Sequence, residues 1–260
     1  MIVLDSRYLP NLSWTTIRDL DKSEGVVVLP IGAIEQHGAH LPTATDALLA
    51  ERITIQALEK LPAEAKVWRL PVQSYGKSNE HLGYAGTISL RAETLMMVLH
   101  DIASSVAASG FRRLCFVNAH GGNSALLTMM AREIRIATGL MVFHTFTNAG
   151  APDPVAIPAM EAQYGIHAND WETSLVLYLE PQLVDMRQAI RYYPNIPEGS
   201  LGLTGTAATV SWLTRDWSPT GVLGDPTLAT PERGAARLEA ATTALARVLL
   251  EMSRFEVANG

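Results

Sequence analysis

The sequence contains very little cysteine. Cys115 is the only one among 260 residues, and it lies in the apolar run "RRLCFVNAH". A single cysteine excludes an intrachain disulfide, and the lack of cysteine ligands argues against a structural zinc site. We therefore expect Cys115 to be a core residue. The same scarcity agrees with a reducing compartment and predicts a cytoplasmic protein.

Long apolar runs and basic runs are also absent. No apolar stretch reaches roughly 18 residues, so we expect no membrane span. The N-terminus lacks the basic and apolar regions of a signal peptide. The formal net charge is −6. Neither nucleic acid nor an anionic membrane surface is therefore expected as a partner.

What the sequence does contain is a regular alternation of strand-like and helix-like segments. Hydrophobic residues make up 48% and charged residues 18%, which is typical of a folded chain with a sizeable core. Strand-like apolar runs cover residues 25–33, 66–73, 112–120 and 140–147. Helix-like segments cover residues 46–60, 91–110, 123–139, 172–181 and the stretch that follows Thr230. This alternation predicts an α/β fold with a mostly parallel sheet covered by helices on both faces.

Local signals mark several helix ends. Asn123 and Ser124 are cap residue types at the start of one helix. Thr230 can cap the last helix, whose first position is Pro231. Residues 148–171 are expected to form a long loop with a short helix, and residues 182–230 to form weak elements. With no repeat and no domain boundary, we expect residues 1–260 to form a single domain.

Chemically capable side chains follow three of the predicted strands. The candidate residues on these loops are Glu35, His37, Asp46, His120, His167, Asp170 and Glu172. Because ligands bind at the carboxyl ends of parallel strands, these segments should converge at one edge of the sheet. Imidazole and carboxylate groups suit zinc or manganese. The set exceeds the needs of one catalytic zinc and fits two ions bridged by a carboxylate and a water.

Less specific interpretations exist for each feature. His40 and His81 are open to interpretation as satisfied core or surface histidines, and Asp46 as only a helix cap. The "HGGN" turn at residues 120–123 could cradle a phosphate on backbone N–H groups, as in a sugar-phosphate or nucleotide-binding protein. Against this, the turn contains no Lys or Arg and has acidic surroundings.

Five segments together resemble the creatininase (creatinine amidohydrolase) family, in its "HGGN" form, from about residue 10 to 250. The segments are "LPIGAIEQHGAHLPTATD", "SNEHLGYAGTISL", "NAHGGN", "HANDWETS" and "SPTGVLGDPTLAT". The resemblance implies a three-layer α/β/α fold and two divalent metal ions per chain, zinc or manganese. It also implies hydrolysis of a non-peptide C–N bond in a small amide substrate, and a homo-oligomer, commonly a hexamer.

The resemblance also assigns the metal ligands. Those that match directly are Glu35, Asp46 and His120 for one ion, and His37 and Asp46 for the other, with Asp46 bridging. Creatininase itself has an acidic ligand two residues after the matching histidine, where this chain has Gly122. The resemblance to "HGGN" members assigns Glu172 to this role, with Asp170 as the alternative.

The remaining assignments concern catalysis and the substrate. His167 matches the family's catalytic histidine, and a protonated His167 would help the amide nitrogen to leave after attack by a metal-bridging hydroxide. The expected substrate contacts are Ser78, Gly121, Gly122 and Trp171. The expected substrate is a cyclic amide of the creatinine or lactam type. A formamide and the end of a short peptide are the alternatives, and the sequence does not choose among them.

Overall fold

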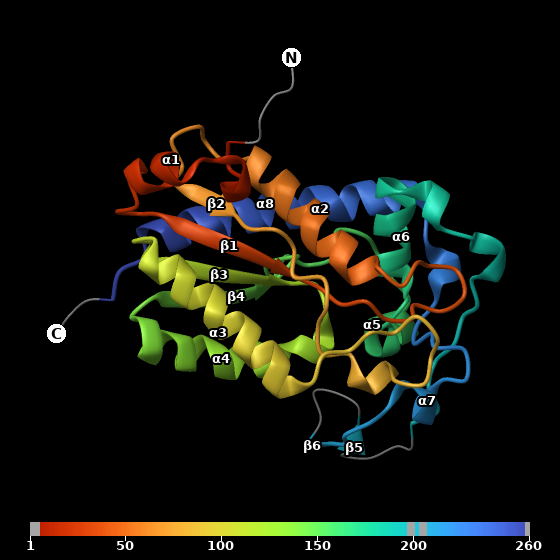
Figure 1. Ribbon diagram of the computed structural model, residues 1–260. Helices are drawn as coiled ribbons and strands as arrows, with labels where there is room; N and C mark the ends of the chain where they lie inside the picture. The colour runs from red at the N-terminus through yellow and green to blue at the C-terminus, as the bar shows by residue number, and fades with distance from the viewer. Residues whose placement is uncertain (1–5, 197–200, 203–206, 258–260) are drawn as a thin grey trace.

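A four-stranded parallel sheet forms the centre of the computed structural model, which describes residues 6–196, 201–202 and 207–257 (Figure 1). The strands lie in the order β2-β1-β3-β4. Their bounds are Val67–Arg69 for β2, Val26–Ile31 for β1, Arg113–Asn118 for β3 and Met141–Phe146 for β4. In register, Val26 faces Val67 on one side and Arg113 on the other, and Arg113 faces Met141. The predicted parallel sheet is therefore confirmed.

Helices cover both faces of this sheet, which confirms the three-layer α/β/α architecture (Figure 1). One layer contains α2 (Thr45–Glu59), α6 (Asp170–Leu179) and α8 (Pro231–Arg254). The other contains α3 (Ala92–Ala108) and α4 (Ser124–Thr138), with α1 (Trp14–Asp19) at its margin. The shorter elements are α5 (Ala159–Tyr164), α7 (Thr214–Trp217), β5 (Leu201–Gly202) and β6 (Ala208–Thr209). No helix in the described ranges has the length and apolarity of a membrane span.

Both faces of the central strands are buried, which explains their continuous apolar runs. Val26 and Val28 pack against the layer of α2 and α8, whereas Val27 and Leu29 pack against the layer of α3 and α4. Cys115 on β3 is fully buried in the first of these cores, as the sequence predicts. Burial raises the pKa of its thiol to about 12, so this cysteine is an inert core residue.

Several predicted boundaries shift for local reasons. The second strand ends at Arg69, two residues before Pro71, although the Leu70 N–H still donates to the Val28 carbonyl oxygen of β1. Asn123 does not cap α4. Its side chain instead donates to the Gly32 carbonyl and accepts from the Lys77 N–H, so it ties two loops together. Thr230 does cap α8, by accepting a hydrogen bond from the Arg233 N–H.

The sheet order creates a crevice at the carboxyl ends of β1 and β3. From β1 the chain passes to β2 on one side, and it later returns to β3 on the other side, which makes this pair the topological switch point. A Cβ on Gly32 would lie 2.5 Å from the Ala47 backbone nitrogen. Glycine therefore allows the first turn of α2 to pack against the end of β1, and this packing brings Asp46 to the crevice.

Candidate metal centre

Asp46 stands between two imidazoles at the switch point. Its Oδ1 lies 3.2 Å from His37 Nε2, and its Oδ2 lies 3.1 Å from His120 Nδ1. His37 follows β1, His120 follows β3, and Asp46 lies in the first turn of α2 rather than at its cap. The helix dipole favours a carboxylate there. One carboxylate thus lies between two histidines from separate strands, and it meets His120 at Nδ1, whereas Glu35 meets the same ring at Nε2.

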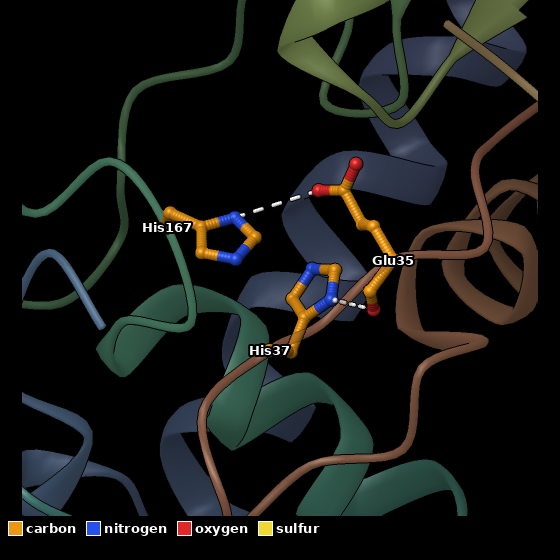
Figure 2. Close-up of side chains that lie close together, drawn as sticks. All are labelled: Glu35, His37 and His167. Carbon is orange, nitrogen blue, oxygen red and sulfur yellow. Dashed lines mark hydrogen bonds and ion pairs between the residues drawn. The ribbon is translucent and has the colours of Figure 1, made fainter. Parts of the chain in front are cut away.

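Glu172 joins this group from α6. Its Oε2 lies 4.0 Å from His37 Nε2, and ligand atoms of His37, Asp46 and Glu172 all lie within 4.8 Å of one another. His37 Nδ1 lies 3.1 Å from the Glu35 carbonyl oxygen, and a hydrogen bond donated there leaves Nε2 for a metal (Figure 2). Asp170 points elsewhere, since Arg233 and Arg237 both donate to its carboxylate. The structure therefore places Glu172, and not Asp170, beside His37.

A second group surrounds His120. Glu35 Oε2 and Glu80 Oε1 each lie 3.3 Å from His120 Nε2. Ligand atoms of Glu35, Glu80 and His120 lie within 4.8 Å of one another. The sequence analysis did not select Glu80, although it stands directly before His81 in the "SNEH" motif. The only signal was a carboxylate next to a histidine in a loop, and that signal is weak.

Several buried polar atoms of these groups have no hydrogen-bond partner among the described residues. They include both carboxylate oxygens of Glu35, His37 Nε2 and Asp46 Oδ2. A buried carboxylate without a partner is costly, and Glu35 is fully buried. Divalent cations would compensate these charges, and the donors are of the types that zinc and manganese accept. The residues present therefore fit the metal centre that the sequence implied.

The electrostatics of the metal-free chain support the same conclusion. Burial would lower the pKa of His37, but the charges of Asp46, Glu172 and Glu35 raise it to about 10. Burial likewise opposes a charged His120, and Glu35 and Asp46 hold its pKa well above the usual value. Burial raises the pKa of Glu172 to about 7. In the metal-free chain, protons on His37, His120 and Glu172 thus offset the negative charge of the carboxylates. A metal ion that binds here has to displace these protons.

His167 lies on the segment after α5, where a short antiparallel bridge to Leu223 holds it. Its Nε2 lies 2.7 Å from the Gln36 carbonyl oxygen, which assigns the proton to Nε2. Nδ1 then carries the lone pair and lies 3.6 Å from Glu35 Oε1 (Figure 2). Burial, together with His37 and His81, lowers the pKa of His167 well below its usual value. This direction favours a neutral resting imidazole, so the protonated His167 expected at the leaving step has to gain its proton during the reaction.

The two other histidines have structural surroundings. His81 Nδ1 lies 2.9 Å from Gln36 Nε2 and 3.0 Å from Thr214 Oγ1, while its Nε2 lies 3.3 Å from Glu35 Oε1. His40 Nε2 lies 3.0 Å from Thr173 Oγ1. Both side chains are buried. His81 corresponds to a satisfied core histidine that also flanks the Glu35 carboxylate, whereas His40 Nδ1 has no hydrogen-bond partner among the described residues.

A cavity of about 830 Å³ opens onto these groups. The ligand-type residues that line it are Glu35, Asp46, Glu80, His120, His167 and Glu172. The other lining residues include Lys77, Gly121, Gly122, Ile166, Trp212 and Leu213. Ser78 does not line this cavity; it is fully buried behind it, with Oγ 3.5 Å from His120 Nε2.

Trp171, which the sequence analysis expects to contact the substrate, does not line the cavity either. It precedes Glu172 by one position on α6, which turns it about 100° around the helix axis. Its ring packs against the hydrophobic core, with the Arg237 guanidinium 5.3 Å from the ring centroid. Trp212, in a region that the sequence marked only as weakly structured, supplies the aromatic wall instead.

Comparisons with known proteins find relatives that match most of this chain. The sequence model of the Creatininase family, described as creatinine amidohydrolase, matches residues 10–249. A mycofactocin precursor peptide peptidase of Mycobacterium tuberculosis is 37% identical over 232 residues, covering 86% of this chain and 84% of the relative. A creatinine amidohydrolase of Pseudomonas putida is 32% identical over 186 residues, covering 65% and 70%.

Solved structures show the same likeness. A creatininase structure with Mn is 26% identical, with a TM-score of 0.74, and the match covers 95% of this chain and 98% of that one. A mutant creatininase of the Zn-Zn type is 25% identical, with the same TM-score and coverage.

Proposed function

Because the chain belongs to the creatininase family, whose members named above are hydrolases, we propose that its metal centre hydrolyses the C–N bond of an amide. The observation that carries this proposal is Asp46 between His37 and His120 in the crevice of the sheet. Two divalent ions per chain, zinc or manganese, are part of the proposal. The ligand set is Glu35, His37, Asp46, His120 and Glu172.

His167 is the proposed proton-transfer residue. When bound, the two ions would acidify a water molecule and polarise the amide carbonyl. The Nδ1 lone pair of His167 can accept the proton that this water gives up and then deliver it to the leaving nitrogen. The Nε2–H keeps donating to the Gln36 carbonyl oxygen, and this hydrogen bond fixes the ring. A neutral resting imidazole is the form that this sequence of steps requires.

The cavity also bears on the substrate. Its volume of about 830 Å³ lies near the upper end of the usual range for small-ligand sites. The lining of the cavity combines the apolar Ile166, Trp212 and Leu213 with the cationic Lys77. A peptide end could use both kinds of contact, and the relative that is 37% identical carries the name of a peptide peptidase. These observations favour a short-peptide end over a small cyclic amide. Backbone N–H groups of Gly121 and Gly122 are the proposed contacts to the scissile amide.

The phosphate-binding alternative has no support from the site. The Gly121–Gly122 turn faces Glu35, Glu80 and Asp46, and these carboxylates would repel a phosphate group. A non-hydrolytic nucleotide-binding function is therefore not part of the proposal.

An activity screen tests the proposed function. The chain loaded with Zn²⁺ or Mn²⁺ would be incubated with creatinine, lactams, formamides and short peptides, and the products would be followed by mass spectrometry. We expect turnover of at least one amide class, abolished by a chelator and by His167→Ala. His100→Ala, at an exposed histidine of α3, is the matched control and should retain activity. No hydrolysis of any class by the metal-loaded chain would contradict the proposal.

The organisation of the protein completes the proposal. We propose one domain over residues 1–260, a homo-oligomer, of hexameric type by its family, and a cytoplasmic location. Light scattering on purified protein would measure the oligomeric mass as a multiple of 28.2 kDa.

A further inference from the structure

Position 122 and Glu80 compete for the same space. Gly122 follows His120 in the short turn before α4. A Cβ built on Gly122 would lie 2.1 Å from Glu80 Oε1, 2.4 Å from His120 Nε2 and 2.6 Å from the Lys77 carbonyl oxygen. All three contacts are shorter than any real Cβ contact. Glycine at this position is therefore what allows the Glu80 carboxylate to reach His120.

The acceptors around His120 Nε2 outnumber the protons it can offer. Glu35 and Glu80 each place an oxygen 3.3 Å from this nitrogen, and the Lys77 carbonyl oxygen lies 3.0 Å away. A single N–H cannot satisfy three oxygens. Glu35 is fully buried, and neither of its oxygens has a hydrogen-bond partner in the described part of the chain. A small divalent cation, which accepts several oxygen ligands at once, would satisfy this arrangement.

We propose that Glu80 is a further ligand of the metal ion that Glu35 and His120 hold, and that glycine at position 122 makes room for it. This inference rests on the proposed metal centre and extends its ligand set. With Glu80 included, both sites have one imidazole and two carboxylates. The Lys77 carbonyl oxygen, 3.0 Å from His120 Nε2, gives this site one oxygen more than the site of His37, Asp46 and Glu172. Oxygen ligands suit manganese, so this is the site that Mn²⁺ should prefer.

Manganese binding to the full-length chain tests the inference without an activity assay. The chain would be titrated with Mn²⁺ alone, and free Mn²⁺ would be counted by electron paramagnetic resonance. We expect the wild-type chain to bind about two ions. Glu80→Gln should weaken one of them by at least about tenfold and leave the other unchanged. Gly122→Ala should weaken the same ion, because the added methyl group displaces the Glu80 carboxylate. Glu64→Gln, at an exposed carboxylate, is the control and should bind as the wild type does.

The outcomes separate this inference from the proposed function. If Glu80→Gln binds both ions with wild-type affinity, Glu80 is only an ion-pair partner of His120, and the inference fails while the metal centre stands. If the wild-type chain binds no Mn²⁺, the inference fails, and the proposed metal centre fails with it only if the chain binds no Zn²⁺ either. If Glu80→Gln does not fold, Glu80→Asp decides, since its carboxylate is one carbon shorter. Weaker binding of one ion then supports the inference, and unchanged binding of both overturns it.

Discussion

At the scale of single residues, His167 joins two properties that proton transfer requires. Its Nε2 is committed to the Gln36 carbonyl, and its Nδ1 lone pair faces the Glu35 carboxylate in the cavity. Burial keeps the ring neutral by lowering its pKa. His167 is outside the groups His37–Asp46–Glu172 and Glu35–Glu80–His120, although one of its nitrogens also lies within 4.8 Å of ligand atoms of Glu35 and His37.

We predict that His167→Ala keeps both metal ions and loses about 10²-fold or more in kcat. The reason is that an amide nitrogen leaves slowly unless it is protonated. Metal content by elemental analysis and steady-state kinetics would check this. The loss should be smaller for a substrate whose leaving group needs no proton. An unchanged kcat in the fully metallated variant would remove His167 from the mechanism, and loss of a metal ion would place it among the ligands.

Glu172 is predicted to make metal affinity pH-dependent. Burial raises the pKa of Glu172 to about 7 in the metal-free chain, and a metal ligand has to be deprotonated. Apparent affinity at one site should therefore fall as pH decreases through about 7, by up to about tenfold per pH unit. In Glu172→Gln, affinity at that site should be low at every pH and keep only the dependence that displacing the His37 proton imposes, without the steeper fall below about 7. Isothermal titration from pH 5.5 to 8.5 would measure the metal affinity of the wild type and of Glu172→Gln. A wild-type affinity that does not change over this interval would contradict the prediction.

At the scale of elements, buried ion pairs join α6 to α8. Arg237 of α8 is almost fully buried and donates to the carboxylates of Asp153 and Asp170. Arg233 adds a second ion pair to Asp170, whose position opens α6. These contacts fix the helix that presents Glu172. They therefore position the metal centre through α6, without touching it.

We predict that Arg237→Met destabilises the fold by about 3–5 kcal/mol, because it leaves Asp170 and Asp153 with fewer partners in a buried site. Arg247→Met, at an exposed position of the same helix, should change stability by less than about 1 kcal/mol. Urea denaturation of the two variants would measure the difference. Equal stability of both would contradict the structural role of Arg237.

The same ion pairs predict a pH dependence. Burial would raise the pKa of Asp170, but hydrogen bonds from Arg237 and Arg233 outweigh it and hold the pKa below the usual value. A carboxylate with a depressed pKa stabilises the fold above its unfolded pKa, about 3.9, and this contribution is lost as pH falls through the folded pKa. The stability gap between wild type and Arg237→Met should thus narrow below about pH 4. A gap that stays constant down to pH 2.5 would contradict this.

At the scale of the whole molecule, the metal centre joins the layers of the fold. Its groups come from the ends of β1 and β3, from α2 and α6, and from the loop that carries Glu80. Bound cations should therefore stabilise the entire α/β/α structure rather than one loop. Their removal leaves buried carboxylates that repel one another.

We predict that about two divalent ions bind per chain and that a chelator lowers the thermal midpoint together with activity. A ligand at about 100 times its Kd adds about 2.7 kcal/mol to the folded state. Elemental analysis and differential scanning calorimetry, with and without chelator, would check this. Readdition of Mn²⁺ or Zn²⁺ should restore the midpoint. Full activity without bound metal would contradict the prediction.

What the sequence determined by itself is the layered fold and the location of most ligand-type residues. Buried strands read as continuous apolar runs, and amphipathic helices as periodic ones, because both patterns depend on near neighbours in the chain. The sequence places Glu35, His37 and His120 directly after predicted strands. Because the carboxyl ends of parallel strands lie at one edge of the sheet, this pattern predicted where the crevice lies.

Only the tertiary structure decided how these side chains meet. Contacts between segments far apart in sequence bring Glu80 to His120 and lower the pKa of His167. They also place Trp212 in the cavity lining and Trp171 against the hydrophobic core. The choice of Glu172 over Asp170 depends likewise on Arg233 and Arg237, more than 60 positions away. Hydrogen-bond partners, burial and charge are properties of the packed neighbourhood, and no local periodicity encodes them.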